Sequence, residues 1–321
     1  MSDVLIKGDK MISVLTSVYN EQENEIRESI DSILSQSHTD FELIIVVDKP
    51  DNEKAIKLLR EYEEKDSRVK VIINEKNIGL ALSMNVAAEA ASGEYFLRMD
   101  ADDVCYPGRF QMQYDCINGS DYDLVCGNYD FIDEDGTLLP QKAAVYNDKQ
   151  LRKLLPLRNI IHHPTVIMRA DKFRAIGGYR NYKCAQDYDL WLRMLCAGYK
   201  MHMMPEKLIK YRVRLASTTV MHRYKQSCTG QYIRELYKNK MNGYTYENYL
   251  EYLKSHNAEE KLANEDFMAN SKLYLDSKVA LKKGKIVKGI SGLYKVIFKS
   301  KYYRPRILKS IKIAVITRLA R

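Results

Sequence analysis

Residues 95–103 read Tyr-Phe-Leu-Arg-Met-Asp-Ala-Asp-Asp, and the interpretation of the whole chain starts from this stretch. Its apolar half has the length and composition of a strand buried on both faces, and it leads directly into three carboxylates. Like charges this close repel one another, so such a cluster at a strand end is typical of a site that binds a cation. A solvated acidic turn is the equal alternative.

The segments before this strand alternate in the manner of a parallel α/β sheet. Apolar runs of strand length occupy residues 12–18, 43–47 and 69–73, and helical patterns occupy 23–36, a segment ending near 65, and 79–91. Ligands of open α/β sheets bind outside the carboxyl ends of the strands. The acidic cluster is therefore expected at the ligand-binding edge.

Two more of these strands end in polar residues. Asp48 follows the second strand, and alone it is more typical of a helix cap than of a site. The first strand ends in Thr-Ser-Val-Tyr-Asn-Glu at residues 16–21. Three adjacent polar strand ends at a parallel sheet are typical of a nucleotide site.

The charge of the chain is unevenly distributed. The 321 residues include 51 Lys and Arg against 42 Asp and Glu, a net charge of +9, but residues 271–321 alone contribute +14. Residues 1–270 are therefore mildly acidic, and no nucleic-acid partner is expected. Since 45% of the residues are apolar, disorder of the whole chain is excluded.

The cysteines and the ends of the chain point to the cytosol. The six cysteines form no Cys-x-x-Cys pair and have no zinc-site spacing, so reduced and mostly buried thiols are expected. No leader peptide and no membrane-spanning run is recognisable. We expect a cytoplasmic protein, unless its basic tail carries it to the inner face of the cytoplasmic membrane.

The second half of the chain has a looser pattern. Helices are expected at about 108–117 and 148–155 and around a buried segment at 190–195, with a strand at 124–131 and a turn at 133–136. From about residue 222 the chain is expected to be helical.

Seven short motifs then make the chain recognisable. They resemble, in order and spacing, those of family 2 glycosyltransferases, most nearly the bacterial polysaccharide and O-antigen enzymes, over residues 11 to about 220. The motifs are Ser17–Glu21, Val46–Asp48, Asn77–Leu80, Arg98–Asp103, His163–Thr165, Gly177–Tyr179 and Gln186–Trp191.

The resemblance implies a fold and a set of ligands. The fold is GT-A, an α/β fold with a mostly parallel central sheet flanked by helices. The ligands are a nucleotide-sugar donor, typically a UDP-sugar, and a divalent cation, Mg²⁺ or Mn²⁺. Residues 1–222 would form the catalytic domain, with a nucleotide-binding half at about 11–105 and an acceptor half at about 106–222, and residues 223–321 a basic helical extension.

The resemblance also implies roles on the donor side. Asp48 would accept a hydrogen bond from the base, and Tyr19 and Glu21 would wall the base and ribose site. Asp102 would coordinate the cation that bridges the two phosphates, with Asp100 nearer the ribose or the sugar. The remaining nucleotide-binding candidates are Ser17, Asn77, Arg98 and Arg214.

Asp187 has the place of the catalytic base in the family. A helix cap is the alternative, and the preceding residue is Gln186 where a Glu is usual. Arg214 stands where members often have a histidine. Arginine neutralises phosphate but cannot ligate a metal, so full and partial metal dependence both stay open.

The acceptor or sugar pocket has four further candidates. They are Asp103, His163, Gly178 and Gln186. For His163, packing in the interior is an equal alternative.

The basic tail alternates Lys and Arg with apolar residues at helical spacing. This pattern suits an anionic membrane surface, and a basic helix packed on the catalytic domain is the equal alternative.

The function these observations predict is inverting transfer of a hexose or N-acetylhexosamine. The donor would be a UDP-sugar, and the acceptor a hydroxyl of a growing cell-surface glycan on a polyprenyl-diphosphate carrier. One alternative is a sugar-1-phosphate nucleotidyltransferase, which would need a glycine-rich basic loop after the first strand. The other is a non-catalytic glycosyltransferase-like binding protein, which the intact carboxylates of Asp48, Asp100, Asp102 and Asp187 disfavour.

Overall fold

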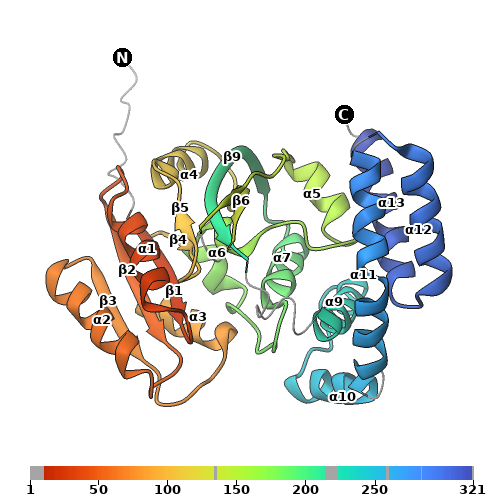
Figure 1. Ribbon diagram of the computed structural model, residues 1–321. Coiled ribbons are helices and arrows are strands. Elements are labelled where there is room, and N and C mark those ends of the chain that lie inside the picture. Colours follow the sequence, from red (N-terminus) through yellow and green to blue (C-terminus); the bar gives the residue numbers. More distant parts are fainter. Residues whose placement is uncertain (1–10, 134–135, 214–222, 258–259, 283, 320–321) are drawn as a thin grey trace. The chain divides into compact units, whose positions relative to one another are not determined.

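The computed structural model describes residues 11–133, 136–213, 223–257, 260–282 and 284–319. The chain divides into two compact units. The first comprises Met1–Arg152 and Asn159–Leu215, and the second comprises Lys153–Arg158 and Ala216–Arg321. All the described strands belong to the first unit, and the second is helical (Figure 1).

The four strands expected in the first half are present and parallel, as predicted. They stand in the order β3-β2-β1-β4. Three helices connect them, as the alternating pattern requires. The strands are β1 (Ile12–Val18), β2 (Phe41–Val47), β3 (Val69–Ile73) and β4 (Tyr95–Arg98), and the helices are α1 (Glu23–Leu34), α2 (Glu53–Lys65) and α3 (Leu80–Ala90).

The second half continues the same sheet in the order β4-β8-β6-β9-β5. Here β8 runs antiparallel between β4 and β6, whereas β9 runs parallel to β6. The strands are β5 (Val104–Cys105), β6 (Leu124–Ile132), β7 (Leu138–Leu139), β8 (Ile167–Arg169) and β9 (Met201–Arg212). The helices are α4 (Arg109–Asn118), α5 (Asp148–Leu154), α6 (Ala170–Ala175) and α7 (Gln186–Cys196), with a short 3₁₀ turn at His163–Thr165.

The sequence did not predict β8 and β9. β8 has only three residues. β9 contains Pro205, which lacks a backbone N–H and argues against a strand assignment. The structure accommodates this proline where the register of β9 against β6 shifts, next to Asn128.

The core explains why the apolar runs are continuous. Leu43, Ile45 and Val47 of β2 are fully buried in one cluster together with Ile26 and Ile33 of α1. The intervening residues of β2 are buried as well, because helices cover both faces of the sheet. Each such side chain contributes about 1.5–3 kcal/mol to stability.

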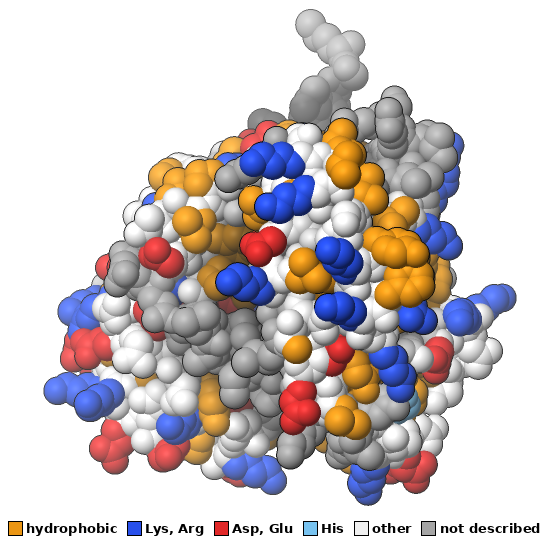
Figure 2. All heavy atoms as spheres, turned by 45° about the vertical axis from the view of Figure 1, so that its right-hand side comes forward, with side chains coloured by type: hydrophobic (Ala, Val, Ile, Leu, Met, Phe, Trp, Pro, Cys, Tyr) orange, Lys and Arg blue, Asp and Glu red, His pale blue; other side chains and the backbone are white. Residues whose placement is uncertain are grey.

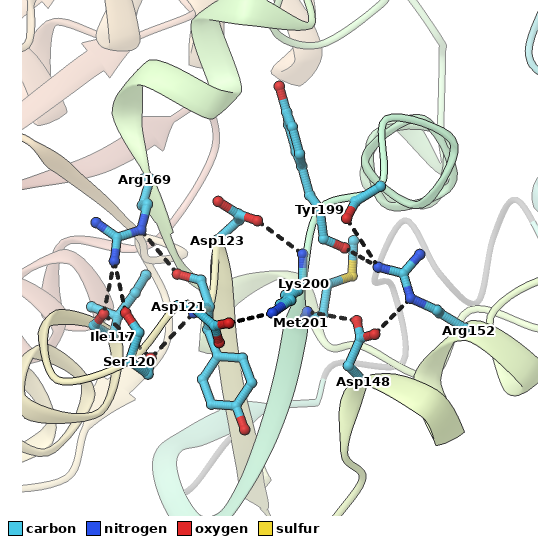
Figure 3. Close-up of polar contacts among 12 residues, drawn as sticks. Ile117, Ser120, Asp121, Asp123, Asp148, Arg152, Arg169, Tyr199, Lys200 and Met201 are labelled. Carbon is cyan, nitrogen blue, oxygen red and sulfur yellow. Dashed lines mark hydrogen bonds and ion pairs between the residues drawn. The ribbon is translucent and has the colours of Figure 1, made fainter.

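A polar network fastens the sheet at the amino ends of β6 and β9 (Figure 3). The guanidinium of Arg169 donates to two carbonyl oxygens of the α4–β6 connection and to one in the last turn of α4, at 3.0–3.1 Å. Asp123 accepts the N–H of Lys200 at 2.9 Å, and Asp148 accepts the first N–H of β9 at 3.0 Å and the Arg152 guanidinium at 2.6 Å. Backbone N–H and carbonyl groups at and beside these strand ends thus have side-chain hydrogen-bond partners.

The second unit is built from five helices among its described residues. They are α9 (Arg223–Lys238), α10 (Tyr246–Asn257), α11 (Glu260–Lys282), α12 (Ile286–Lys299) and α13 (Tyr303–Leu319). None of the described helices combines the length and apolar character needed to cross a bilayer.

Candidate active site

The carboxyl ends of β1, β2 and β4 meet at one edge of the sheet. Val18 of β1 is in register with Val47 of β2, and the next N–H, that of Asp48, donates to the Val18 carbonyl at 2.8 Å. Leu15 of β1 is in register with Arg98, the last residue of β4. The polar residues that follow the three strands are therefore neighbours, as the sequence predicted.

Asp48 orders the loop between β3 and α3. Its side chain is buried and accepts hydrogen bonds from the Asn74 amide at 2.8 Å and from the N–H groups of Ile78 and Gly79 at 2.9 Å each. Gly79 has φ +88°, a conformation that costs glycine little. The loop that carries Asn77 is thus held against the end of β2.

An exposed tyrosine marks the end of β1. The side chain of Tyr19 is 43% exposed, although large apolar rings are usually covered. Its N–H donates to Glu21 at 2.6 Å, and the Asn52 amide donates to its carbonyl oxygen at 3.1 Å. Ser17, the residue before the last one of the same strand, is half-buried. Asn77 is exposed. These bonds hold the backbone of Tyr19, and its exposed ring can stack on a flat ligand at this open edge.

A buried arginine neutralises part of the acidic turn. Arg98 is 2% exposed and pairs with the carboxylate of Asp100, which stays 29% exposed. The Ser29 hydroxyl of α1 donates to the Asp100 carbonyl at 3.1 Å. Asp100 is thus fixed from two sides, while part of its carboxylate remains accessible to a ligand.

Asp103 faces the interior, which differs from the expected place in a sugar pocket. It has no exposed surface, and its Oδ1 accepts the N–H of Arg212 at 2.9 Å. Burial raises the pKa of Asp103 well above its usual range, and the charges of Asp100 and Asp102 raise it further. Asp103 therefore ties the end of β9 to the acidic turn.

Arg212 completes this connection. Its Nε donates to the Asp102 carbonyl oxygen at 3.0 Å, and its terminal nitrogen pairs with Glu28 of α1. The guanidinium is 2% exposed. One arginine thus joins α1, β9 and the backbone of the acidic turn.

The accessible carboxylates suit a cation that a substrate helps to hold. Asp100 and Asp102 are both partly exposed. Within the described residues no group of three or more His, Cys, Asp and Glu could hold a metal ion. Mg²⁺ commonly binds through one or two carboxylates and takes its remaining ligands from substrate phosphates and water. These two aspartates fit that arrangement.

Asp187 lies in the first turn of α7 and contacts Asn159, whose amide donates to its Oδ2 at 2.7 Å. Burial is the largest influence on Asp187 and raises its pKa. The bonds from Asn159 and from backbone N–H groups of the helix lower the pKa, and the Asp100 charge raises it. A carboxylate with a raised pKa is a stronger proton acceptor.

His163 and His162 face different surroundings. The Nε2 of His163 lies 2.7 Å from the Tyr179 hydroxyl, and burial lowers the pKa of His163 well below its usual range. His162 stacks on Tyr129, with the ring centroids 4.1 Å apart, and contacts Tyr211 at 4.4 Å. Burial lowers the pKa of His162 to about 4. Burial thus favours the neutral form of both imidazoles.

The chain before α7 approaches α3 closely. Gly178 has φ +62°, and a Cβ there would lie 2.7 Å from the Asn85 side chain. The Asn85 amide donates to the Tyr179 carbonyl oxygen at 2.8 Å, and the Tyr179 N–H donates back to Asn85 at 2.8 Å. Gln186, the first residue of α7, is buried. The glycine thus permits the approach that the sequence suggested.

Two functional candidates were missed by sequence reasoning, and one predicted residue lies outside the described part. Asn159 belongs to no recognised motif, and Arg212 was assigned no role of its own within the segment Tyr211–Arg214; each contacts its partner only through the tertiary fold. For Arg212, its position two residues before the predicted Arg214 was the available signal. Arg214 itself falls within residues 214–222, outside the described residues.

Solved structures define the class of fold. That of S. aureus TarS in complex with UDP-GlcNAc has a TM-score of 0.61, with 19% identity over 93% of this chain and 83% of that one. That of GalNAc-T7 with UDP, GalNAc and Mn²⁺ has a TM-score of 0.56, with 16% identity over 68% of this chain and 47% of that one. The fold is GT-A, as expected.

Sequence comparison then gives the family. The Glycosyl transferase family 2 model matches residues 13–177. An uncharacterized glycosyltransferase of Methanocaldococcus jannaschii is 34% identical over 72% of this chain and 80% of its own length. The O-antigen biosynthesis glycosyltransferase WbnJ of Escherichia coli is 34% identical over 72% of this chain and 90% of its own length. The chain belongs to glycosyl transferase family 2, and it is a glycosyltransferase.

Proposed function

We propose that this glycosyltransferase moves a hexose or N-acetylhexosamine from a UDP-sugar to a hydroxyl of a growing cell-surface glycan, with inversion. The observation that carries the proposal is Asp187, a carboxylate in the first turn of α7 that accepts the Asn159 amide at 2.7 Å and whose pKa is raised by burial. The similarity to WbnJ, an O-antigen biosynthesis glycosyltransferase, supports a glycan acceptor. The UDP-GlcNAc and UDP named for the two structural neighbours support a UDP-linked donor.

In the proposed reaction, Asp187 accepts the proton of the acceptor hydroxyl. The hydroxyl oxygen forms a bond to the anomeric carbon from one side while the bond from that carbon to the diphosphate oxygen breaks on the other. The leaving nucleoside diphosphate takes the electron pair. A single displacement of this kind inverts the anomeric configuration, and a general base contributes about 10²–10⁴-fold to such a step.

On the donor side, the exposed ring of Tyr19 would stack on the base, and Glu21 would close the ribose site. Asp48 would contact the base while it orders the loop that carries Asn77. Asp102 would hold a divalent cation between the two phosphates, with Asp100 beside the ribose or sugar. The cation, Mg²⁺ or Mn²⁺, would supply positive charge to the departing diphosphate.

The remaining assignments concern domains, acceptor and location. We assign catalysis to residues 1–222 and place the acceptor half at about 106–222, where His163, Gly178 and Gln186 would shape the pocket. Arg214 would stabilise the diphosphate. A polyprenyl-diphosphate carrier would hold the acceptor glycan, so the enzyme would work peripherally at the inner face of the cytoplasmic membrane.

The test is donor turnover by the full chain. Incubation with a panel of nucleotide sugars and Mn²⁺ should release UDP from one of them, and Asp187→Asn should reduce that release at least a hundredfold. Release of pyrophosphate from a sugar 1-phosphate and a nucleoside triphosphate would instead favour the nucleotidyltransferase alternative. Calorimetric UDP binding without any turnover would favour a binding protein.

A further inference from the structure

Helix α12 leaves most of its large apolar side chains exposed to solvent. In an amphipathic helix of a globular protein, the large apolar residues normally face the interior. In α12 the buried positions are Gly289, Gly292 and Val296. Leu293 and Ile297 are half-buried. Five other large apolar side chains are 58–83% exposed; they are Ile286, Val287, Ile290, Tyr294 and Phe298, here called the α12 stripe.

The glycines account for this orientation. A Cβ at Gly292 would overlap the side chain of Ser277 in α11, and one at Gly289 would overlap the side chain of Leu281. The two helices therefore approach closely only with the glycine face of α12 turned toward α11. At 100° per residue, the centre of the α12 stripe lies roughly 160° away from these glycines. Packing with α11 thus leaves the stripe uncovered.

The surroundings of the stripe are cationic. Lys288, Lys295 and Lys299 are exposed and share one flank of α12, since they are seven and four residues apart. Figure 2 shows hydrophobic side chains gathered over this part of the molecule, with Lys and Arg side chains beside them. No Asp or Glu follows Asp276 in the sequence.

The apolar stripe and its lysine flank together indicate which kind of partner could cover this surface. A second copy of the chain would bring one lysine-flanked stripe against another, and like charges would then oppose association. An anionic bilayer offers an apolar layer for Ile290 and Phe298 and negative headgroups for the lysines. Tyr294 suits the boundary between the two, because its ring is apolar and its hydroxyl is polar.

We propose that the α12 stripe and its lysine flank form the surface by which the protein docks on an anionic lipid bilayer, with α12 lying in the interface plane. Leu308 and Ile311 of α13, which are 52% and 51% exposed, extend the apolar surface of this unit. The inference deepens the proposed location at the membrane. It assigns the contact to particular residues, which the basic composition of the tail could not do.

The test is sedimentation of the full chain with vesicles of phosphatidylglycerol and phosphatidylcholine, compared with phosphatidylcholine alone. We expect sedimentation with the anionic vesicles only. The double variant Ile290→Ser/Phe298→Ser should weaken it at least tenfold. Leu262→Ser is the matched control, because Leu262 is 61% exposed on α11, outside the stripe, and it should bind like the original chain. Lys288→Glu/Lys295→Glu should also bind more weakly, whereas Lys142→Glu should not.

A fluorescent reporter tests the insertion itself. The chain has one tryptophan, Trp191, which is fully buried, so Tyr294→Trp adds one exposed indole to a constant background. We expect its emission to shift to the blue with anionic vesicles and to be quenched by brominated lipid. An unshifted spectrum, or vesicle binding that survives Ile290→Ser/Phe298→Ser, would overturn the proposal.

The competing occupant gives a different outcome. A concentration-dependent dimer in analytical ultracentrifugation that the stripe variant abolishes, together with no vesicle binding, would assign the stripe to a second copy. UDP release from the donor in the presence of a soluble acceptor is measured separately. A failure of vesicle binding with intact turnover refutes only the docking surface, and a failure of turnover with intact vesicle binding refutes only the transferase assignment.

Discussion

Replacing Arg212 with Met should destabilise the first unit measurably, because this guanidinium joins three parts of the fold. Its side chain is 2% exposed, and it contacts the Asp102 carbonyl oxygen at 3.0 Å as well as Glu28. Removing one partner of a fully buried ion pair costs about 3–5 kcal/mol. Glu28 is 55% exposed and can be rehydrated, so we expect a loss of roughly 2–3 kcal/mol.

For a unit of this size that loss corresponds to a fall in melting temperature of roughly 4–12 °C. The matched control is Arg27→Met. It removes an exposed i,i+4 ion pair with Glu23 in α1, the helix that also carries Glu28. Such pairs contribute about 0.3–0.5 kcal/mol, so the control should melt within roughly 2 °C of the original chain. Thermal unfolding followed by circular dichroism measures both. Equal shifts in the two variants would refute the reasoning.

Three further predictions concern the site. Asp102→Asn should abolish most UDP release and raise the Mn²⁺ concentration needed for half-maximal activity. The melting temperature should stay within a few degrees of that of the original chain. An unchanged Mn²⁺ titration would remove Asp102 from the cation site. Asn159→Ala removes a bond that lowers the pKa of Asp187. Since the proposed base must be deprotonated, the acidic limb of the pH profile of kcat/KM should move to higher pH, and a limb that stays or moves down would contradict the proposed role. Gly178→Ala places a Cβ 2.7 Å from the Asn85 side chain at φ +62° and should cost about 1–3 kcal/mol in urea unfolding, whereas Gly136→Ala, with nothing within 4 Å of the Cβ, should cost less.

The first half of the fold was predictable because its strands are buried on both faces. The run from Leu43 to Val47 has no polar interruption, and the structure covers it on both sides. β9 was not predictable in the same way, because Pro205 and the irregular register beside Asn128 interrupt its pattern. Its pairing partners lie far away in sequence, so local pattern carried no information about it.

The site shows the same division. The clustering of Asp100 and Asp102 after a strand was visible in the sequence, since strand ends meet at a known edge. The contacts that fix these groups were not visible, because Arg212 reaches Asp102 across 110 residues and Asn159 reaches Asp187 across 28. Asp103 shows the limit most clearly. Its motif position suggested a pocket, whereas its complete burial shows a structural contact.

The network around Arg169, Asp123 and Asp148 has a consequence for how this enzyme could diversify. It secures the sheet at the amino ends of β6 and β9, away from the edge where β1, β2 and β4 end. Loops at the carboxyl ends can therefore change in length and composition without loosening these anchors. A chimaera that exchanges residues 74–79 for the corresponding loop of a relative should keep its sheet intact.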